Sequence, residues 1–318
     1  MNILVGDNEV GKSTVLEAIN IVASGNIKRI ESIGLDKLFN IAVVQEFNSG
    51  ERTFENLPNM IIELYLKVEN NQNRFAMQTE QRYYITPKGY FYSNRLAFFL
   101  AKSGSINDIN QRIETYFDEL IIDEIQDIAG RDFNFLEEIM LADVKMLFVG
   151  DFYQHTFDTS RDGVVNKNLF KDKAEYETRF TSKGFKSDTT TLLNSWRCSQ
   201  SVCTYIKDNI GIDISSNRTK DDDTKIYVPS ETKEKKRILN DDSIVKLHYQ
   251  NGAKYGFCHK NWGETKGEDH YQNVCVLLNK STSEKFFSGK LDELPPSTKN
   301  KLYVAITRAR GDVYFINE

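Results

Sequence analysis

The sequence predicts an α/β fold with two halves, each built on a mostly parallel sheet. Its 318 residues exceed the length of a typical single domain and suffice for two cores. Short apolar runs alternate with segments of helical periodicity, which is the pattern of a parallel sheet covered by helices. A glycine-rich loop near the start, and acidic turns after two of the apolar runs, mark the sheet edge where ligands bind.

The composition is that of a globular protein, with 40% hydrophobic residues, 27% charged residues and a net charge of -5. This acidic balance excludes nucleic-acid binding by bulk positive charge, so any such contact needs a local groove. No apolar run of about 18 residues occurs, and the glycine loop begins at residue 6, which leaves no room for a signal peptide. We therefore expect a cytoplasmic protein with no membrane partner.

The four cysteines form no C-x-x-C pair, and the four histidines complete no zinc-ligand spacing. Cys258 and His259 are the only adjacent pair of these residue types, and ordinary reduced thiols are favoured there over a metal. We expect no structural disulfide, in keeping with a cytoplasmic protein.

The first part of the chain predicts a strand, a loop and a helix. Residues 2–5 are an apolar run, residues 6–13 are the glycine loop, and apolar residues then recur at helical spacing up to Val22. A further strand is expected over residues 60–66, followed by a polar loop at 69–73. Aromatic residues then crowd the stretch from 82 to 100, and a helical pattern follows over residues 106–116.

Two strand-and-turn units come next. Apolar runs at 120–122 and 146–149 each lead into an acidic turn, and a helix carrying Phe135 and Ile139 separates them. In a parallel sheet both turns lie at the carboxyl edge. The charge-rich stretch from 217 to 242 is interpreted as a solvated loop and surface helix. A second sheet is expected from strands at 244–247, 274–278 and 313–316.

The glycine loop has the pattern G-x-x-x-x-G-K-S over residues 6–13, with the required strand before it and helix after it. Glycines allow backbone N–H groups to face phosphate oxygens, and the helix N-terminus adds its dipole. Lys12 would reach the β- and γ-phosphates, and Ser13 would offer its hydroxyl to Mg²⁺. The predicted nucleotide-binding residues, for ATP with Mg²⁺, are Gly6, Asn8, Gly11, Lys12, Ser13 and Thr14.

Two further side chains at this edge suit phosphate chemistry. Asp123 ends a buried strand, where a carboxylate can hold Mg²⁺, and the adjacent Glu124 can orient the attacking water. Gln154 follows the next strand, where an amide can sense the γ-phosphate or its water. A simple turn explains Gln154 equally well at this stage.

Arg197 and Arg308 are the candidate cationic clamps. A planar guanidinium is well suited to the charge that spreads over the γ-phosphate oxygens in the transition state, with an effect of about 10³ to 10⁵ in rate. We expect an apolar stripe on a helix through Leu302 and Ala309, flanked by Arg308 and Arg310. For Arg310 a surface ion pair is the favoured interpretation.

Five segments occur in the order of helicase motifs II to VI, namely residues 123–127, 150–154, 194–199, 265–269 and 304–310. They resemble superfamily 1 DNA helicases of the UvrD/Rep/PcrA type. The terminal region is most similar to the helicase-like subunit of the Gabija phage-defence system, and the resemblance covers about residues 82 to 318.

The resemblance implies two RecA-like P-loop NTPase lobes, over residues 1–190 and 191–318, that hydrolyse ATP and move on single-stranded or partly duplex DNA in phage defence or DNA repair. It implies Asp123 as a metal ligand and Glu124 as catalytic base, with γ-phosphate contacts from Gln154, Arg197 and Arg308. Aromatic residues near these motifs stack on bases in the family, so Phe152, Tyr153 and Trp196 are either DNA contacts or core residues.

The chain also departs from the helicase pattern. Asp269 stands where the usual motif V has a glutamate, which puts ribose or loop coordination there in doubt. No segment resembles the glutamine-containing adenine-recognition motif or motif Ia. The interval between Arg197 and Lys266 is too short for the large inserted subdomain of the UvrD type.

The first part of the chain resembles a different family. Residues 2–20 and 57–66 are similar to the ABC-type ATPase of overcoming-lysogenization-defect (OLD) nucleases and RecF-like proteins, over about residues 1–68. We interpret the chain as a fusion in which residues 69–90 join this segment to helicase motifs II and III in residues 91–190. Two alternatives stay open: a nucleotide-binding regulatory subunit with an OLD-type nuclease partner, and a degenerate fusion whose P-loop does not dock on the helicase sheet.

Overall fold

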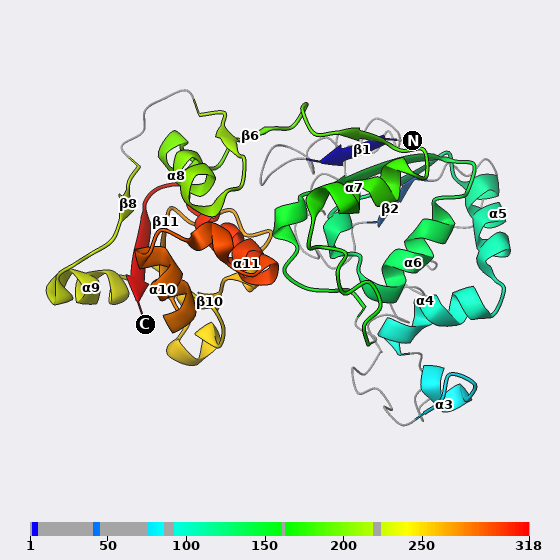
Figure 1. Ribbon diagram of the computed structural model, residues 1–318, viewed down its shortest axis with the longest axis horizontal. Coiled ribbons are helices and arrows are strands. Elements are labelled where there is room, and N and C mark those ends of the chain that lie inside the picture. The colour runs from blue at the N-terminus through cyan, green and yellow to red at the C-terminus, as the bar shows by residue number, and fades with distance from the viewer. Residues whose placement is uncertain are drawn as a thin grey trace, which may run out of the picture.

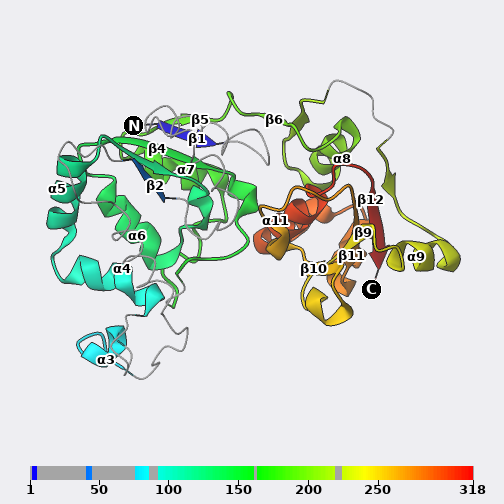
Figure 2. The same ribbon diagram turned by 180° about the vertical axis from the view of Figure 1, so that it is seen from behind.

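The computed structural model describes residues 2–5, 41–44, 76–85, 92–160, 163–218 and 224–317. These residues form two five-stranded sheets with helices packed on them, and a small two-stranded sheet of β6 (Asn194–Ser195) and β7 (Ser215–Ser216). Figures 1 and 2 show the two sheets in separate halves of the molecule, with α11 (Pro296–Ile306) between them in both views. The predicted α/β class with mostly parallel sheets is confirmed.

Sheet A has the strand order β2-β3-β4-β1-β5. Its strands are β1 (Asn2–Val5), β2 (Ile41–Val44), β3 (Glu119–Ile122), β4 (Lys145–Gly150) and β5 (Lys186–Asp188). Only β2 runs antiparallel to its neighbour, while the other pairs are parallel. The predicted strands at 2–5, 120–122 and 146–149 are therefore present, whereas β2 and β5 were not expected from the sequence.

The helices of the sheet-A half are α3 (Gln81–Tyr84), α4 (Ser93–Lys102), α5 (Ile106–Tyr116), α6 (Gly130–Ile139) and α7 (Lys173–Thr181). One face of the sheet, with Ile122 and Phe148, forms a core with Phe133 of α6 and Phe180 of α7. Phe148 and Phe180 pack edge to face at 6.2 Å between ring centroids. Because this core lies directly behind the ends of β3 and β4, it fixes the turns that follow those strands.

Sheet B is parallel throughout and has the order β10-β9-β11-β12-β8. Its strands are β8 (Ile226–Tyr227), β9 (Ile244–His248), β10 (His259–Asn261), β11 (Asn273–Leu278) and β12 (Val313–Asn317). Alternate residues such as Val276 and Phe315 face α8 (Gln200–Ile210) and α11, while Cys275 and Ile316 face α9 (Thr232–Leu239). Helix α10 (Lys280–Phe287) also contacts the first of these faces through Phe286.

The charged stretch from 217 to 242 was expected to be loop and surface helix. α9 confirms the helix, and the short strand β8 in this stretch was missed. The predicted helix after the glycine loop and the predicted strand at 60–66 lie outside the described residues. Within the described residues, no helix is long and apolar enough to cross a membrane.

The predicted helix through Ala309 was too long, because α11 ends at Ile306. Thr307 turns its hydroxyl back to the carbonyl oxygens of Tyr303 and Val304. The backbone N–H of Arg310 then bonds to Tyr271 O at 3.0 Å instead of to its own helix. Arg308 and Arg310 therefore lie in the turn beyond the helix, where the backbone of Arg308 still bonds to Ala305 O and only Arg310 bonds to a distant residue.

Candidate nucleotide site between the two sheets

Three parallel strands of sheet A end at the same edge. Val5 lies opposite Gly150, and Ile122 lies opposite Phe148, so the residues that follow β1, β3 and β4 leave the sheet on one side. β4 lies between β1 and β3, so the strand before the glycine loop is not a direct neighbour of the strand before Asp123. The shared edge is nevertheless what P-loop chemistry needs.

The predicted nucleotide-binding residues Gly6, Asn8, Gly11, Lys12, Ser13 and Thr14 lie outside the described residues. The direction of β1 is described, however, and Gly6 directly follows it. β1 therefore ends at the edge that carries Asp123 and Asp151, and this is the edge at which we expect the loop.

Glu124 has an unusual backbone conformation, with φ 53° and ψ 42° in the left-handed region. A residue with a β-carbon pays about 1 to 2 kcal/mol for it. The turn is held by a bond from Glu124 N to Asp123 Oδ1 at 2.8 Å, and the Glu124 carboxylate accepts Gln126 Nε2 at 2.6 Å. This turn sets the directions of the two adjacent carboxylates before either meets a ligand.

Gln126 joins the two acidic turns, a role that sequence reasoning missed. Besides donating to Glu124, its amide oxygen accepts the backbone N–H of Asp151 at 3.0 Å. The buried Asp151 carboxylate in turn accepts Gln154 Nε2 at 2.9 Å. Tyr303 of α11 also donates its hydroxyl to Asp151, at 3.2 Å. A hydrogen-bonded chain thus runs from Glu124 through Gln126 and Asp151 to the other half of the molecule.

Lys266 makes the second connection between the halves. It follows the short helix η5 (Gly263–Thr265), and its Nζ lies 2.5 Å from Asp127 Oδ1 and 3.4 Å from Glu124 Oε2. Only 10% of the lysine side chain is exposed. Burial raises the pKa of Asp127 to about 6, and the charge of Lys266 opposes that rise. Lys266 therefore both pairs a buried carboxylate and touches the predicted catalytic glutamate.

The two predicted arginine clamps are brought together. Arg197 is buried and donates Nη1 to Thr307 O at 2.9 Å, while Arg308 is buried and donates to the carbonyl oxygens of Val304, Thr265 and Glu268. Burial and the neighbouring charge of Arg308 lower the pKa of Arg197 to about 8. Burial also lowers the pKa of Arg308, against the attraction of nearby acids that include Glu124 and Asp151.

One nitrogen of buried Arg308 is left without a partner within the described part of the chain. Its Nη2 atom has no hydrogen-bond partner among the residues that the structure describes. Two neighbouring buried guanidinium groups repel each other, and a phosphate group would relieve that repulsion. The chemistry of this donor set is compatible with a polyphosphate. Arg310, in contrast, is exposed and lies 3.8 Å from Asp269, the surface pair that the sequence favoured.

A cleft of about 540 Å³ lies beside these contacts, between the two halves. Its wall includes Glu124, Asp127 and Lys266. It therefore lies close to the series of hydrogen bonds that connects Glu124 to Tyr303. The remaining lining residues are Thr156, Phe157, Tyr249, Gln250, Asn261, Gly263, Glu264, Gly267 and Lys301. The cleft therefore adjoins the predicted catalytic carboxylate but extends over a polar surface of the sheet-B half.

The three aromatic residues considered as base contacts have different surroundings. Phe152 is buried in the core of the sheet-A half, so its ring is not open to stacking. Tyr153 is partly buried and packs against the cores of both halves. Trp196 is 66% exposed, next to buried Arg197. Only Trp196 of the three presents most of its ring to solvent.

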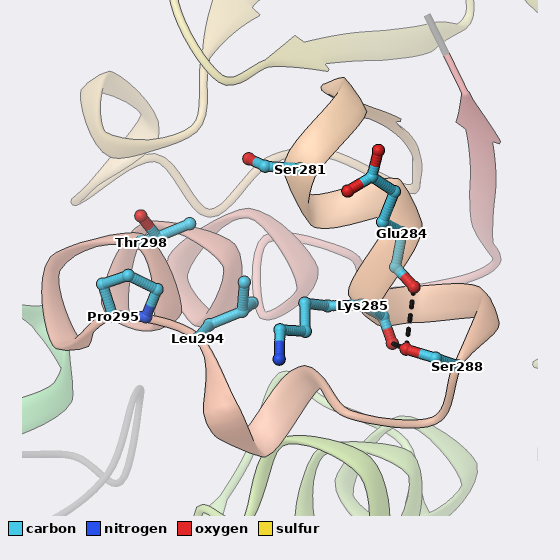
Figure 3. Close-up of a pocket in the computed structure, with 7 residues that line it drawn as sticks. All are labelled: Ser281, Glu284, Lys285, Ser288, Leu294, Pro295 and Thr298. Carbon is cyan, nitrogen blue, oxygen red and sulfur yellow. Dashed lines mark hydrogen bonds between the residues drawn. The ribbon is translucent and has the colours of Figure 1, made fainter.

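A second cavity, of about 360 Å³, lies on the sheet-B half between α10 and the start of α11. Figure 3 shows its seven lining residues, which include Lys285, Ser288 and Leu294. The Ser288 hydroxyl donates to Glu284 O and Lys285 O of its own helix, and Lys285 pairs with Glu293. These polar groups are engaged locally, and none of the predicted site residues lines this cavity.

Comparison with known proteins identifies the family. Residues 93–317 match the viral superfamily 1 RNA helicase core domain. The chain belongs to this helicase family. The predicted superfamily 1 helicase assignment is thereby confirmed for most of the chain, and no curated protein matches it.

Two solved helicase structures are similar to this helicase core. The PRRSV helicase shares 17% identity with a TM-score of 0.38, over 62% of this chain and 34% of that one. Arterivirus nonstructural protein 10, a helicase in complex with DNA, gives 17% identity and a TM-score of 0.38, over 61% of this chain and 38% of that one. The chain thus spans little more than a third of the length of these helicases.

The helicase core offers carboxylates for a magnesium ion at the end of β3. No three His, Cys, Asp or Glu side chains gather as a metal cluster among the described residues. Mg²⁺ in nucleotide sites is held by one or two carboxylates together with substrate phosphates and water. The single strand-end Asp123, with Glu124 beside it, fits that arrangement and does not form an all-protein cage.

Lys266→Met is expected to lower the free energy of unfolding of the helicase core by about 3 kcal/mol, because it leaves Asp127 buried without its cation. Chemical denaturation measures the change, with Lys254→Met on an exposed loop as the control. Adding Asp127→Asn should restore part of the loss. A Lys266→Met variant as stable as the wild type would show that this pair contributes nothing.

Proposed function

We propose that the chain hydrolyses ATP between its two halves and couples hydrolysis to movement along a nucleic-acid strand. The observation that carries the proposal is the contact of Glu124 and Asp151, at the edge of sheet A, with Lys266 and Tyr303 of the other half. Buried Arg308 is bonded to Thr265 O, next to Lys266. A triphosphate at that edge would meet carboxylates and a glycine loop on one side and guanidinium groups on the other.

Each residue has a distinct proposed role. Lys12 and the backbone of the glycine loop bind the phosphates, and Ser13 with Asp123 would hold Mg²⁺, which when bound neutralises phosphate charge. Glu124 accepts a proton from the attacking water. Arg197 and Arg308 stabilise the charge that develops on the γ-phosphate oxygens, and Gln154 senses the γ-phosphate or its water.

The hydrogen-bonded chain supplies the proposed coupling. A change at Glu124 reaches Asp151 through Gln126, and Asp151 is bonded to Tyr303 of α11. Because α11 packs in the core of sheet B, a shift at the nucleotide is transmitted to the half that carries most of the cleft wall. We place the domain boundary between residues 190 and 191, in the connection between β5 and β6.

The proposed partner is single-stranded or partly duplex nucleic acid. The UvrD-type resemblance points to DNA, and the matched family is described for RNA helicases. Stimulation of ATP hydrolysis should therefore be tested with both DNA and RNA. Roles in phage defence or DNA repair follow only from the Gabija and OLD resemblances and are part of the proposal.

The purified full chain is expected to hydrolyse ATP and to do so faster with single-stranded DNA or RNA, whereas Lys12→Ala should lose about 10²-fold or more of that activity. Phosphate release with and without each polymer measures the effect. Lys233→Ala, on the exposed side of α9, serves as a lysine control outside the nucleotide site and the cleft. Wild-type turnover no higher than that of Lys12→Ala would contradict the proposal.

A second candidate rests on the N-terminal resemblance to OLD-type ATPases over residues 1–68. In that case the chain binds nucleotide as a regulatory subunit of an OLD-type nuclease system and unwinds nothing. Nucleotide binding without stimulation by nucleic acid, together with co-purification of such a nuclease, would favour it. The parallel pairing of β1 with β4 supports docking of the first segment on the helicase sheet, as opposed to a degenerate fusion.

A further inference from the structure

The connection between β9 and β10, residues 249–258, carries two aromatic side chains into solvent. Phe257 is 99% exposed and Tyr255 is 64% exposed. Gly256, between them, has a φ of 123°, a conformation that L-residues with side chains rarely adopt. This turn separates the two rings, and we call Tyr255 and Phe257 the aromatic tip.

The aromatic tip stands on an ordered base. Tyr255 stacks on His248 of β9, with ring centroids 4.7 Å apart and an angle of 5° between the planes. His248 Nε2 is 2.9 Å from His259 Nδ1 on β10, and Gly252 N donates to Asn261 Oδ1 at 2.7 Å. One face of the tyrosine ring is therefore fixed against the sheet, while most of the residue is open to solvent.

The same connection forms part of the cleft between the two halves. Tyr249 and Gln250, at its start, and Asn261, at the end of β10, line the cleft. Lys301 of α11 lines it as well, with its Nζ 5.2 Å from the centre of the Tyr249 ring. Residues 249–258 therefore link the wall of the cleft to the aromatic tip.

The aromatic tip stands on a segment with little charge of its own. Residues 243–263 contain no aspartate or glutamate, while Asp241, Asp242 and Glu264 flank them. Of the three lysines in this segment, Lys246 is buried and Lys260 pairs with Glu268. Lys254, next to Tyr255, is exposed. With this limited positive charge, the rings have to supply much of the attraction.

A protein partner fits this surface less well. A stable protein interface covers about 800 Å² on each partner, with a packed apolar centre. The aromatic tip offers two separated rings on a polar connection, and such rings stack on bases of any sequence.

We propose that Tyr255 and Phe257 form a stacking platform for unpaired bases of a single nucleic-acid strand that passes through the cleft, an inference that rests on the proposed function. The platform lies on the sheet-B half, away from the nucleotide residues at the end of β3. It therefore sets the affinity for the strand and leaves the chemistry of hydrolysis unchanged.

Fluorescence anisotropy with labelled single-stranded DNA and RNA of about 16 nucleotides tests the platform on the full chain. Tyr255→Ala and Phe257→Ala should each weaken binding by about 5- to 150-fold, the range that stacking of one base predicts. Phe287→Ala is the matched control, because Phe287 is 63% exposed but belongs to α10 and not to the segment that lines the cleft. Tyr255→Phe and Phe257→Tyr keep a ring and should bind like the wild type.

A second measurement separates this inference from the proposed function. The nucleic-acid concentration that half-maximally stimulates ATP hydrolysis should rise in the two alanine variants, while turnover at saturating nucleic acid stays unchanged. If the wild type binds and is stimulated but both alanine variants match it within about twofold, the platform is wrong and the proposed function stands. A wild type that binds neither polymer would overturn both. Normal strand binding with loss of a co-purifying protein would identify the tip as a protein contact and refute the platform.

Discussion

Glu124→Gln should lower the ATP turnover of this chain by about 10²- to 10⁴-fold, the range for loss of a positioned general base. The amide keeps the size of the side chain but cannot take a proton from the attacking water. The left-handed turn at Glu124 and the bond from Gln126 hold the side chain in place, so the substitution should act on chemistry more than on folding.

Single-turnover hydrolysis and nucleotide affinity, measured separately, test this expectation. Nucleotide affinity should stay within a few-fold of wild type, because Glu124 is not assigned to phosphate binding. Glu138→Gln, on the exposed side of α6, is the control in the same half of the molecule. If the Glu124→Gln enzyme turned over at the wild-type rate, another residue would have to act as the general base.

The acidic turns were predictable because their signals are local. An apolar run that ends in a carboxylate predicts a buried strand whose last residue meets ligand, and both Asp123 and Asp151 follow such strands in the structure. The order of the strands in the sheet depends instead on which strands pair. β1 and β4 are neighbours although more than a hundred residues separate them, and no local pattern specifies that order.

The contacts between the halves could not be read from the sequence for the same reason. Lys266 and Asp127 are 139 positions apart, and Tyr303 and Asp151 are 152 positions apart. Lys266 stands in a segment that the helicase resemblance had marked, yet its pairing with Glu124 and Asp127 depends on how α11 and η5 pack. The length of α11 was misjudged because apolar periodicity continues to Ala309, while tertiary bonds to Tyr271 end the helix earlier.

Arg308→Ala should reduce ATP turnover by about 10³- to 10⁵-fold, the effect expected for an arginine that stabilises charge on a transferred phosphoryl group. Arg308 is 1% exposed, and its Nε and Nη1 are engaged with backbone carbonyl oxygens, which aims the remaining nitrogen. Arg308→Lys keeps the positive charge but loses the planar fork, so most of the loss should persist.

Folding has to be separated from chemistry at this position, because the alanine also frees three carbonyl oxygens from the guanidinium. Arg310→Ala is the matched control: it removes an exposed guanidinium two residues away, in a pair of 3.8 Å with Asp269, and should leave turnover nearly unchanged. Arg308→Lys is compared with wild type for nucleotide affinity, turnover and denaturation midpoint. A folded Arg308→Lys that binds nucleotide but turns over at least 10²-fold more slowly supports the clamp. One that turns over normally would show that the planar guanidinium of Arg308 is not needed for catalysis and would contradict the clamp.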